Sequence, residues 1–380
     1  MSDIAIRSAD VVTHLADGRE VVFFSLPGHD PRPVPDLRPL PARHELASEI
    51  RYDRATGHWV AIAALRQDRT YKPPADQCPL CPSPTGTDSE VPAHDYDVAV
   101  FENRFPSLSG ADLSGAQPDS TFALPAETTA STVAAVGHGR CEVICFSSDH
   151  QASFASLDHA HARLVVDAWR SRTAALSAAP GVAEVFCFEN RGEDIGVTLT
   201  HPHGQIYAYP YLTPRTRSML DQAAHHRTTH GRNLFEDILA SEISDGARIV
   251  SRSEHMTAFV PFAARWPVEV HIYPHRRVRD LTELDDAELD ALTDTYLQIL
   301  RTFDALYPTP LPYIAAVHQY SSDPAQAEGY LHIELMSVRR SATKLKFLAG
   351  SESAMDAFIT DVTPESVAHR LRDVIGEADA

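Results

Sequence analysis

The order of predicted secondary structure is repeated in the two halves of this 380-residue chain, and this repetition restricts the fold more than any other feature. In the first half, an apolar and β-branched run at 141–146 predicts a strand, and apolar residues at helical spacing over 164–176 predict a helix. Two further strands are expected at 184–190 and 205–211. The first half therefore has the order strand, helix, strand, strand.

The second half repeats this order. A strand is expected at 268–273, a helix over 289–300, and strands at 312–320 and 330–338. Short stretches also match: CEVICFSSDH resembles VEVHIYPH, and HPHGQI resembles YLHIEL. We expect an α+β fold with a diverged internal duplication, in which each half is an antiparallel sheet with packed helices.

The ends of the chain differ in character. Residues 1–45 are rich in proline and acidic groups and predict an irregular or extended arm, with the core beginning at Ile50. Thr363 and Pro364 have the residue types of a helix cap and first turn, so a last helix is expected after them. The expected divisions are an arm at 1–45, an N-terminal half at 46–212 and a C-terminal half at 213–380.

Composition excludes several classes of protein. With 43% hydrophobic and 22% charged residues, the chain has the composition of a soluble globular protein. A formal charge of -19 argues against binding to nucleic acid, which requires a basic face. No apolar stretch is long enough to span a membrane, and the N-terminus lacks the pattern of a secretory signal. We therefore expect a cytoplasmic protein.

Cys78 and Cys81 have the C-x-x-C spacing that lets two thiolates bind one tetrahedral zinc ion. A redox pair is the alternative, but redox motifs usually open a helix after a strand, and CPLCPSPTG is a loop interrupted by prolines. Five cysteines are too few for a disulfide framework. Zinc is therefore favoured, and His150 and His201 are candidates for the remaining two ligands.

The run His201-Pro202-His203-Gly204-Gln205 carries the strongest chemical signal. Imidazole is a nucleophile toward phosphorus at neutral pH, and a phosphoramidate divides one transfer into two steps. The glycine lets a phosphate approach the backbone, and the Gln205 amide can donate to a phosphate oxygen. The alternative is that these are two ordinary histidines among the twenty in the chain.

Taken together, the motifs resemble the galactose-1-phosphate uridylyltransferases, a branch of the histidine-triad superfamily. The matching segments are RYDRATGHWVAIA, CPLC, VFENRF, VICFSSDH, FENRG, HPHGQIY and RSATKLKFLAGSE, in family order over about residues 50–355. The resemblance implies two histidine-triad-like halves, a homodimer, and a ping-pong transfer of UMP from UDP-glucose to galactose 1-phosphate through His203. It also implies a structural zinc ion on Cys78, Cys81, His150 and His201.

The resemblance implies further substrate contacts. Asn103 and Asn190 match uridine or ribose contacts, although asparagines also close turns. Arg66 and Arg69 match a pair that serves the phosphates across a dimer interface, although single arginines are commonly solvated. The remaining matches are Thr198 near phosphate, Gln205 on phosphate, and Lys346, Phe347 and Glu352 at the hexose.

The chain departs from the family pattern in two places. Some members hold a second metal with an upstream glutamate and three histidines. Here His318 and His332 are present, and Glu334 occupies the position of the third histidine, so either a metal site or a buried polar cluster is expected. The segment around Phe358 also lacks a glutamine that some members use on the hexose.

Two other functions remain open from the sequence. An adenylyltransferase of the same branch, acting on ADP-glucose or a dinucleoside polyphosphate, would use the same histidine chemistry. A non-catalytic, zinc-containing nucleotide-binding module would keep the fold without the reaction. The complete HPHGQ run argues against the second alternative, because a binding module does not require an imidazole beside phosphate.

Overall fold

The computed structural model describes residues 6–7, 9–41, 48–68, 71–110 and 132–378. The chain divides into two compact units that interleave along the sequence. Unit 1 comprises Met1–Ala152, Asp167–Cys187 and His201–Met219, and unit 2 comprises Ser153–Val166, Phe188–Thr200 and Leu220–Ala380. Three elements pass from one unit into the other: α1 (His159–Ser177), β9 (Glu184–Arg191) and α2 (Pro214–His230).

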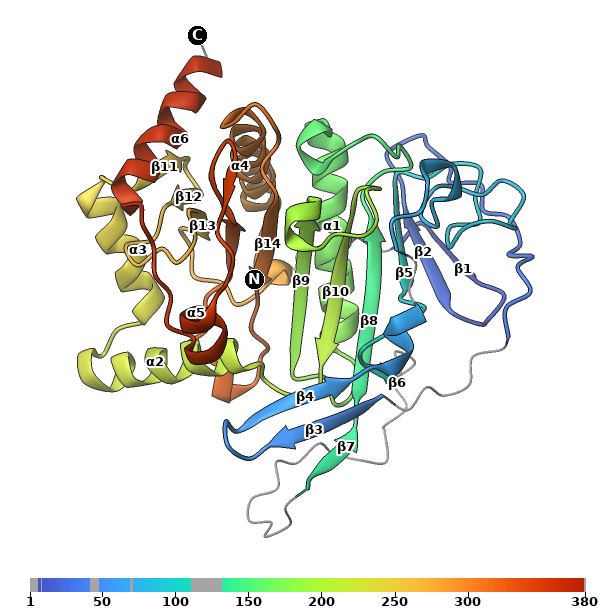
Figure 1. Cartoon of the computed structure of the whole chain (residues 1–380), viewed down its shortest axis with the longest axis horizontal. Helices are drawn as coiled ribbons and strands as arrows, with labels where there is room; N and C mark the ends of the chain where they lie inside the picture. Colours follow the sequence, from blue (N-terminus) through green and yellow to red (C-terminus); the bar gives the residue numbers. More distant parts are fainter. Residues whose placement is uncertain (1–5, 8, 42–47, 69–70, 111–131, 379–380) are drawn as a thin grey trace. The chain divides into compact units, whose positions relative to one another are not determined.

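Unit 1 contains an antiparallel sheet with the strand order β1-β2-β5-β8-β10, followed by the start of β9 (Figure 1). A second, smaller antiparallel sheet has the order β4-β3-β7. The strands are β1 (Val11–His14), β2 (Glu20–Phe24), β3 (Glu49–Asp53), β4 (His58–Ile62), β5 (Val98–Glu102), β6 (Ser109–Gly110), β7 (Ala134–Val136), β8 (His138–Cys145) and β10 (His203–Tyr209).

The N-terminal segment belongs to this sheet, which corrects one expectation. β2 pairs with β5 along its length, and Val21, Val22, Phe23 and Phe24 are buried. The core therefore begins well before Ile50. The prolines of residues 26–41 dominated the composition of the arm, whereas the short apolar run that precedes them contributes a strand because its burial stabilises the sheet.

Helix α1 packs on β8 within unit 1. The Trp169 ring meets Phe146 edge to face with centroids 6.0 Å apart. The Arg172 guanidinium donates to both oxygens of Glu142 at 2.7 and 2.9 Å, and both side chains are buried. A bidentate pair of this kind fixes the helix against the strand that leads to His150.

Unit 2 contains an antiparallel sheet with the order β14-β15-β13-β12-β11 (Figure 1). Helix α4 packs against β12, β13 and α6. The elements are α3 (Leu234–Asp245), β11 (Ile249–Arg252), β12 (Met256–Phe259), β13 (Val268–Pro274), α4 (Asp286–Ala305), β14 (Tyr313–His318), β15 (His332–Ser337), β16 (Arg339–Ser341), β17 (Lys344–Leu345), α5 (Gly350–Met355) and α6 (Pro364–Ala378).

The predicted α+β class and the repeated element order are confirmed. In the first half β8 pairs with β10, which neighbours β9, and in the second half β13 pairs with β15, which pairs with β14. In both halves, the last of the three strands in the sequence therefore lies between the other two. The boundary expected between residues 212 and 213 stays a prediction.

Candidate active site

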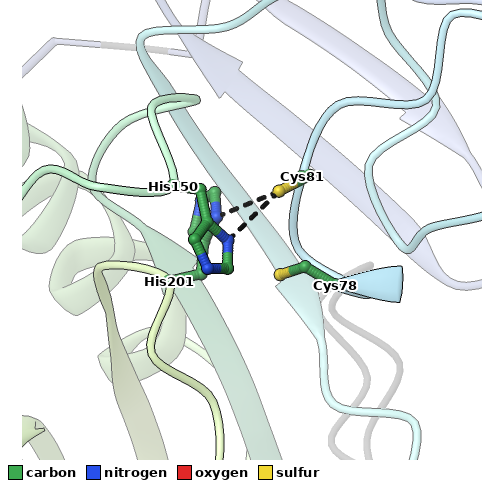
Figure 2. A group of neighbouring side chains, drawn as sticks. All are labelled: Cys78, Cys81, His150 and His201. Carbon is green, nitrogen blue, oxygen red and sulfur yellow. Dashed lines mark hydrogen bonds between the residues drawn. The ribbon is translucent and has the colours of Figure 1, made fainter. Parts of the chain in front are cut away.

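Unit 1 brings together the four side chains expected to bind zinc (Figure 2). The ligand atoms of Cys78, Cys81, His150 and His201 all lie within 4.8 Å of one another. The Cys81 Sγ atom is 3.4 Å from Nδ1 of His150 and 3.5 Å from Nδ1 of His201. The two cysteines face the two histidine rings, as a tetrahedral site requires.

Local structure explains this convergence. Cys78 ends a 3-10 turn, Ala75–Gln77, and the loop that follows carries Cys81. His150 follows the end of β8, and His201 lies two residues before β10. Because β8 and β10 are antiparallel, with Cys145 opposite His203, the end of one strand lies beside the start of the other.

The contacts of His201 assign its ring nitrogens. The Nε2 atom lies 2.8 Å from the Ser147 carbonyl oxygen and 2.8 Å from the Tyr96 hydroxyl, which itself donates to the Leu80 carbonyl oxygen. The Ser147 oxygen only accepts, so Nε2 carries the proton and Nδ1 has the lone pair that faces Cys81. Metal-ligating histidines characteristically have such a partner on the second nitrogen.

Electrostatics are consistent with a bound cation. Burial, together with the neighbouring Cys78 thiol, raises the pKa of Cys81 to about 12. Burial also lowers the pKa of His201 to about 4, which keeps this ring neutral. Two adjacent thiolates require a positive charge between them, which a divalent ion would supply. The donor set, two cysteine sulfurs and two imidazoles, therefore fits zinc.

His203 is the first residue of β10 and is half-buried. Its Nδ1 atom lies 2.7 Å from the backbone oxygen of His201, so Nδ1 carries the proton and Nε2 has the free lone pair. Burial lowers the pKa of His203, against the opposing effect of this hydrogen bond. His201 lies outside β10, two residues before its first residue.

A hydrogen-bonded chain leads from Arg66 to Gln205. Arg66 donates to the Tyr207 hydroxyl at 3.2 Å and to the Ser107 hydroxyl at 3.1 Å. The Tyr207 hydroxyl in turn donates to Oε1 of Gln205 at 3.1 Å, so the amide nitrogen of Gln205 is the group left to donate elsewhere. Sequence reasoning missed Tyr207, which ends the HPHGQIY motif, and Tyr96, for which the sequence carries no signal.

The other predicted substrate residues have varied surroundings. Oδ1 of Asn103 accepts from the Phe105 backbone N–H at 2.9 Å, so this side chain closes a turn. Asn190 and Thr198 belong to unit 2 and are half-buried. Phe347, in the same unit, is exposed. Lys346 forms an ion pair with Glu352 at 3.4 Å. Arg69 lies outside the described residues.

Unit 2 contains a second buried group of possible metal ligands, His318, His332 and Glu334. Nε2 of His318 lies 3.4 Å from Oε2 of Glu334, and Nε2 of His332 lies 3.7 Å from Oε1. The Nδ1 atom of His332 donates to the Tyr330 carbonyl oxygen at 2.8 Å, which leaves Nε2 as the possible ligand atom. The sequence analysis missed His271 and Arg265, which also contact Glu334, at 3.6 and 3.3 Å.

Comparison with known proteins identifies the class and then the family. A solved uridylyltransferase structure is 30% identical, covers 87% of this chain and 99% of its own, and has a TM-score of 0.75. The fold is thus that of the uridylyltransferases. An ADP-glucose phosphorylase from Arabidopsis thaliana, solved with bound ADP-glucose, shares the fold at 22% identity with a TM-score of 0.62, covering 86% of this chain and 99% of its own.

Sequence comparison is more specific. The family models for the N-terminal and C-terminal domains of galactose-1-phosphate uridyl transferase match residues 40–213 and 219–378. The galactose-1-phosphate uridylyltransferase of Streptomyces lividans is 47% identical over 95% of this chain and 97% of its own length. The galactose-1-phosphate uridylyltransferase of Thermotoga maritima is 32% identical over 86% of this chain and 98% of its own length. The chain belongs to the galactose-1-phosphate uridylyltransferase family.

Proposed function

We propose that this protein transfers UMP from UDP-glucose to galactose 1-phosphate through a covalent uridylyl group on His203. The observation that carries the proposal is the hydrogen bond from Nδ1 of His203 to the His201 carbonyl oxygen, which orients Nε2 with its lone pair free. This hydrogen bond selects the tautomer in which Nε2 can act as a nucleophile toward phosphorus.

The reaction has two balanced steps. Nε2 of His203 attacks the α-phosphorus of UDP-glucose, the bond to the bridging oxygen breaks, and glucose 1-phosphate leaves with that electron pair. Nδ1 keeps its proton and donates it in a hydrogen bond to the His201 carbonyl oxygen, both before and after Nε2 is uridylylated. A phosphate oxygen of galactose 1-phosphate then attacks the same phosphorus, the P–N bond breaks, and UDP-galactose is released with His203 restored.

Neighbouring residues stabilise the phosphate. Gln205, with Oε1 engaged by Tyr207, directs its amide N–H groups to a non-bridging oxygen as charge develops there. Following the family pattern, Arg66 and Arg69 serve the phosphates, Thr198 lies near them, and Asn103 and Asn190 contact the uridine or ribose. Phe347 and Glu352 belong to the hexose site.

We assign a zinc ion to Cys78, Cys81, His150 and His201. Bound there, zinc ties the cysteine loop to the turn before β10 and so stabilises the backbone that presents His203, without taking part in the chemistry. His318, His332 and Glu334 also fit a second divalent ion, since the facing Nε2 atom of His332 is unprotonated.

The remaining parts of the proposal concern the cell and the assembly. We propose a cytoplasmic homodimer that acts on small sugar phosphates, with no nucleic-acid or membrane partner. Within the described part of the chain, no helix combines the length and the hydrophobicity needed to cross a bilayer. The net charge of -19 supports a partner other than nucleic acid.

Labelling with radioactive phosphate tests the reaction. Wild-type protein incubated with UDP-glucose labelled at the α-phosphate, then quenched in alkali, should carry an acid-labile label on the peptide containing His203. Galactose 1-phosphate should discharge it as UDP-galactose. His203→Ala should not be labelled, whereas His225→Ala, which removes an exposed histidine on α2, should label normally.

Other outcomes identify the alternatives. Label from ADP-glucose but not from UDP-glucose would replace the proposal with an adenylyltransferase. Nucleotide binding without any covalent label would indicate that the protein is a non-catalytic nucleotide-binding module.

A further inference from the structure

Lys346 is buried, although lysines are rare in this chain and usually exposed in proteins. The chain has three lysines, and Lys72 and Lys344 are exposed. The Lys346 side chain is only 1% exposed. A buried ammonium is costly unless polar partners replace its water, so the contacts of this group indicate its role.

Three acceptors surround the ammonium. Nζ donates to the backbone oxygen of Arg265 at 3.0 Å and to the backbone oxygen of Ile359, and it lies 3.4 Å from Oε1 of Glu352. A lysine ammonium has three N–H donors and no acceptor. Two hydrogen bonds and one ion pair thus surround the ammonium, so a substrate oxygen would have to displace one of these partners.

The three acceptors belong to separate segments of unit 2. Arg265 precedes β13, Glu352 lies in the first turn of α5, and Ile359 follows α5. Apolar packing holds this last region only weakly, since Met355 is 77% exposed and Ile359 is 64% exposed. The polar contacts of Lys346 therefore connect the α5 segment to the sheet.

Phe358 strengthens the same connection. Its ring packs against Trp266 with centroids 5.7 Å apart, and Nζ of Lys346 lies 5.6 Å from its centre. Phe358 occupies the segment in which some family members have a glutamine. Here that segment contributes packing around the ammonium.

We infer that Lys346 is a positioning residue that holds the Glu352 carboxylate in place for the hexose, and that it does not itself bind substrate. The inference rests on the proposed function for the role of Glu352. A carboxylate fixed by one oxygen can accept from a sugar hydroxyl in one orientation only, so losing the ammonium should disorder the acceptor without removing it. This role differs from the substrate contact that the family resemblance implies for Lys346.

Reductive methylation of the wild-type protein tests accessibility without any variant. Mild treatment with formaldehyde and a borane reductant, followed by peptide mass spectrometry, should methylate Lys72 and Lys344 and leave Lys346 unmodified. The pattern should be the same with and without UDP-glucose. Methylation of Lys346 in the free protein, with protection by UDP-glucose, would overturn the inference and make it a substrate contact.

A double-mutant cycle tests the coupling. Glu352→Gln and Lys346→Met should each lower kcat/KM for galactose 1-phosphate by about 100-fold, and the double variant should be no worse than either alone. Lys344→Met, an exposed lysine two residues away, is the matched control and should match wild type.

Independent losses that multiply in the double variant would show that Lys346 does not act through Glu352. If Lys346→Met does not fold, the methylation result decides the inference. Labelling of His203 in the wild-type protein is a separate result, so failure of this inference is distinguishable from failure of the proposed reaction.

Discussion

His203 and Gln205 illustrate how function is divided between residue type and surroundings. Their side chains are competent for phosphoryl chemistry anywhere in a protein, but a hydrogen bond to one nitrogen or one oxygen decides which atom is available. In this protein the His201 backbone oxygen accepts a hydrogen bond from Nδ1 of His203, and the Tyr207 hydroxyl donates one to Oε1 of Gln205. In the proposed mechanism, these single contacts orient one side chain as the nucleophile and the other as a hydrogen-bond donor.

Glu189, beside Asn190, should make stability depend on pH. Burial raises its pKa from 4.5 to about 7. The folded state therefore keeps a proton that the unfolded state loses above pH 4.5, and this contribution to stability is lost as pH rises from about 4.5 to 7. The shift corresponds to about 3 kcal/mol of unfolding free energy.

Glu189→Gln should remove this contribution. Urea titrations at a series of pH values should show that wild type loses stability over this range relative to the variant. Glu193→Gln, at an exposed position in the following turn, should keep the wild-type profile. Parallel profiles for wild type and Glu189→Gln would mean that Glu189 is already ionised at pH 5.

At the scale of elements, the cysteine loop and the turn before β10 depend on each other. Both are irregular, and no helix or strand ladder holds Cys81 beside His201. The zinc ion proposed for this site would stabilise the contact further, so metal binding and local folding should be coupled.

Cys78→Ser should lower zinc content and thermal stability together. Zinc content is measured by plasma mass spectrometry after dialysis. We expect the cysteine site to hold near one equivalent of zinc in wild type and well below one equivalent in the variant. Cys187→Ser is the control, because Cys187 is fully buried but lies outside the ligand group. Equal zinc in Cys78→Ser and wild type would exclude this ligand set.

Strand β2 should contribute strongly to stability. Phe23 is fully buried, so Phe23→Ala should cost about 3–5 kcal/mol of unfolding free energy in urea titration. Val12→Ala, on the neighbouring β1 at a position 51% exposed, should change it by less than about 1 kcal/mol. A small effect of Phe23→Ala would mean that the N-terminal strands are peripheral, as the composition of residues 1–45 suggested.

At the scale of the whole molecule, assembly is the main prediction. We expect a homodimer, with a mass in sedimentation of twice the 41.8 kDa of one chain. Activity should then fall on dilution below the dissociation constant, because the family pattern places Arg66 and Arg69 on phosphates across the interface. A fully active monomer would contradict that placement of the arginines.

The sequence by itself determined the fold class and the repeated element order, and together with the family resemblance it predicted the nucleophile and the set of zinc ligands. These depend on periodicity and on closely spaced motifs, which are local properties of the chain. The helix after Thr363 is another example: Pro364 begins α6, and the Thr363 hydroxyl accepts from the Ser366 backbone N–H.

Only the tertiary structure decided the place of β2, the nitrogen that His203 presents and the contacts of Lys346. Each depends on a partner distant in the sequence or on backbone geometry: β5 for β2, the turn at His201 for His203, and the Arg265 and Ile359 backbone oxygens for Lys346. A residue type limits which contacts are possible, but burial and direction come from the folded chain. For this reason the family resemblance identified Lys346 as important, and its three acceptors indicate how it acts.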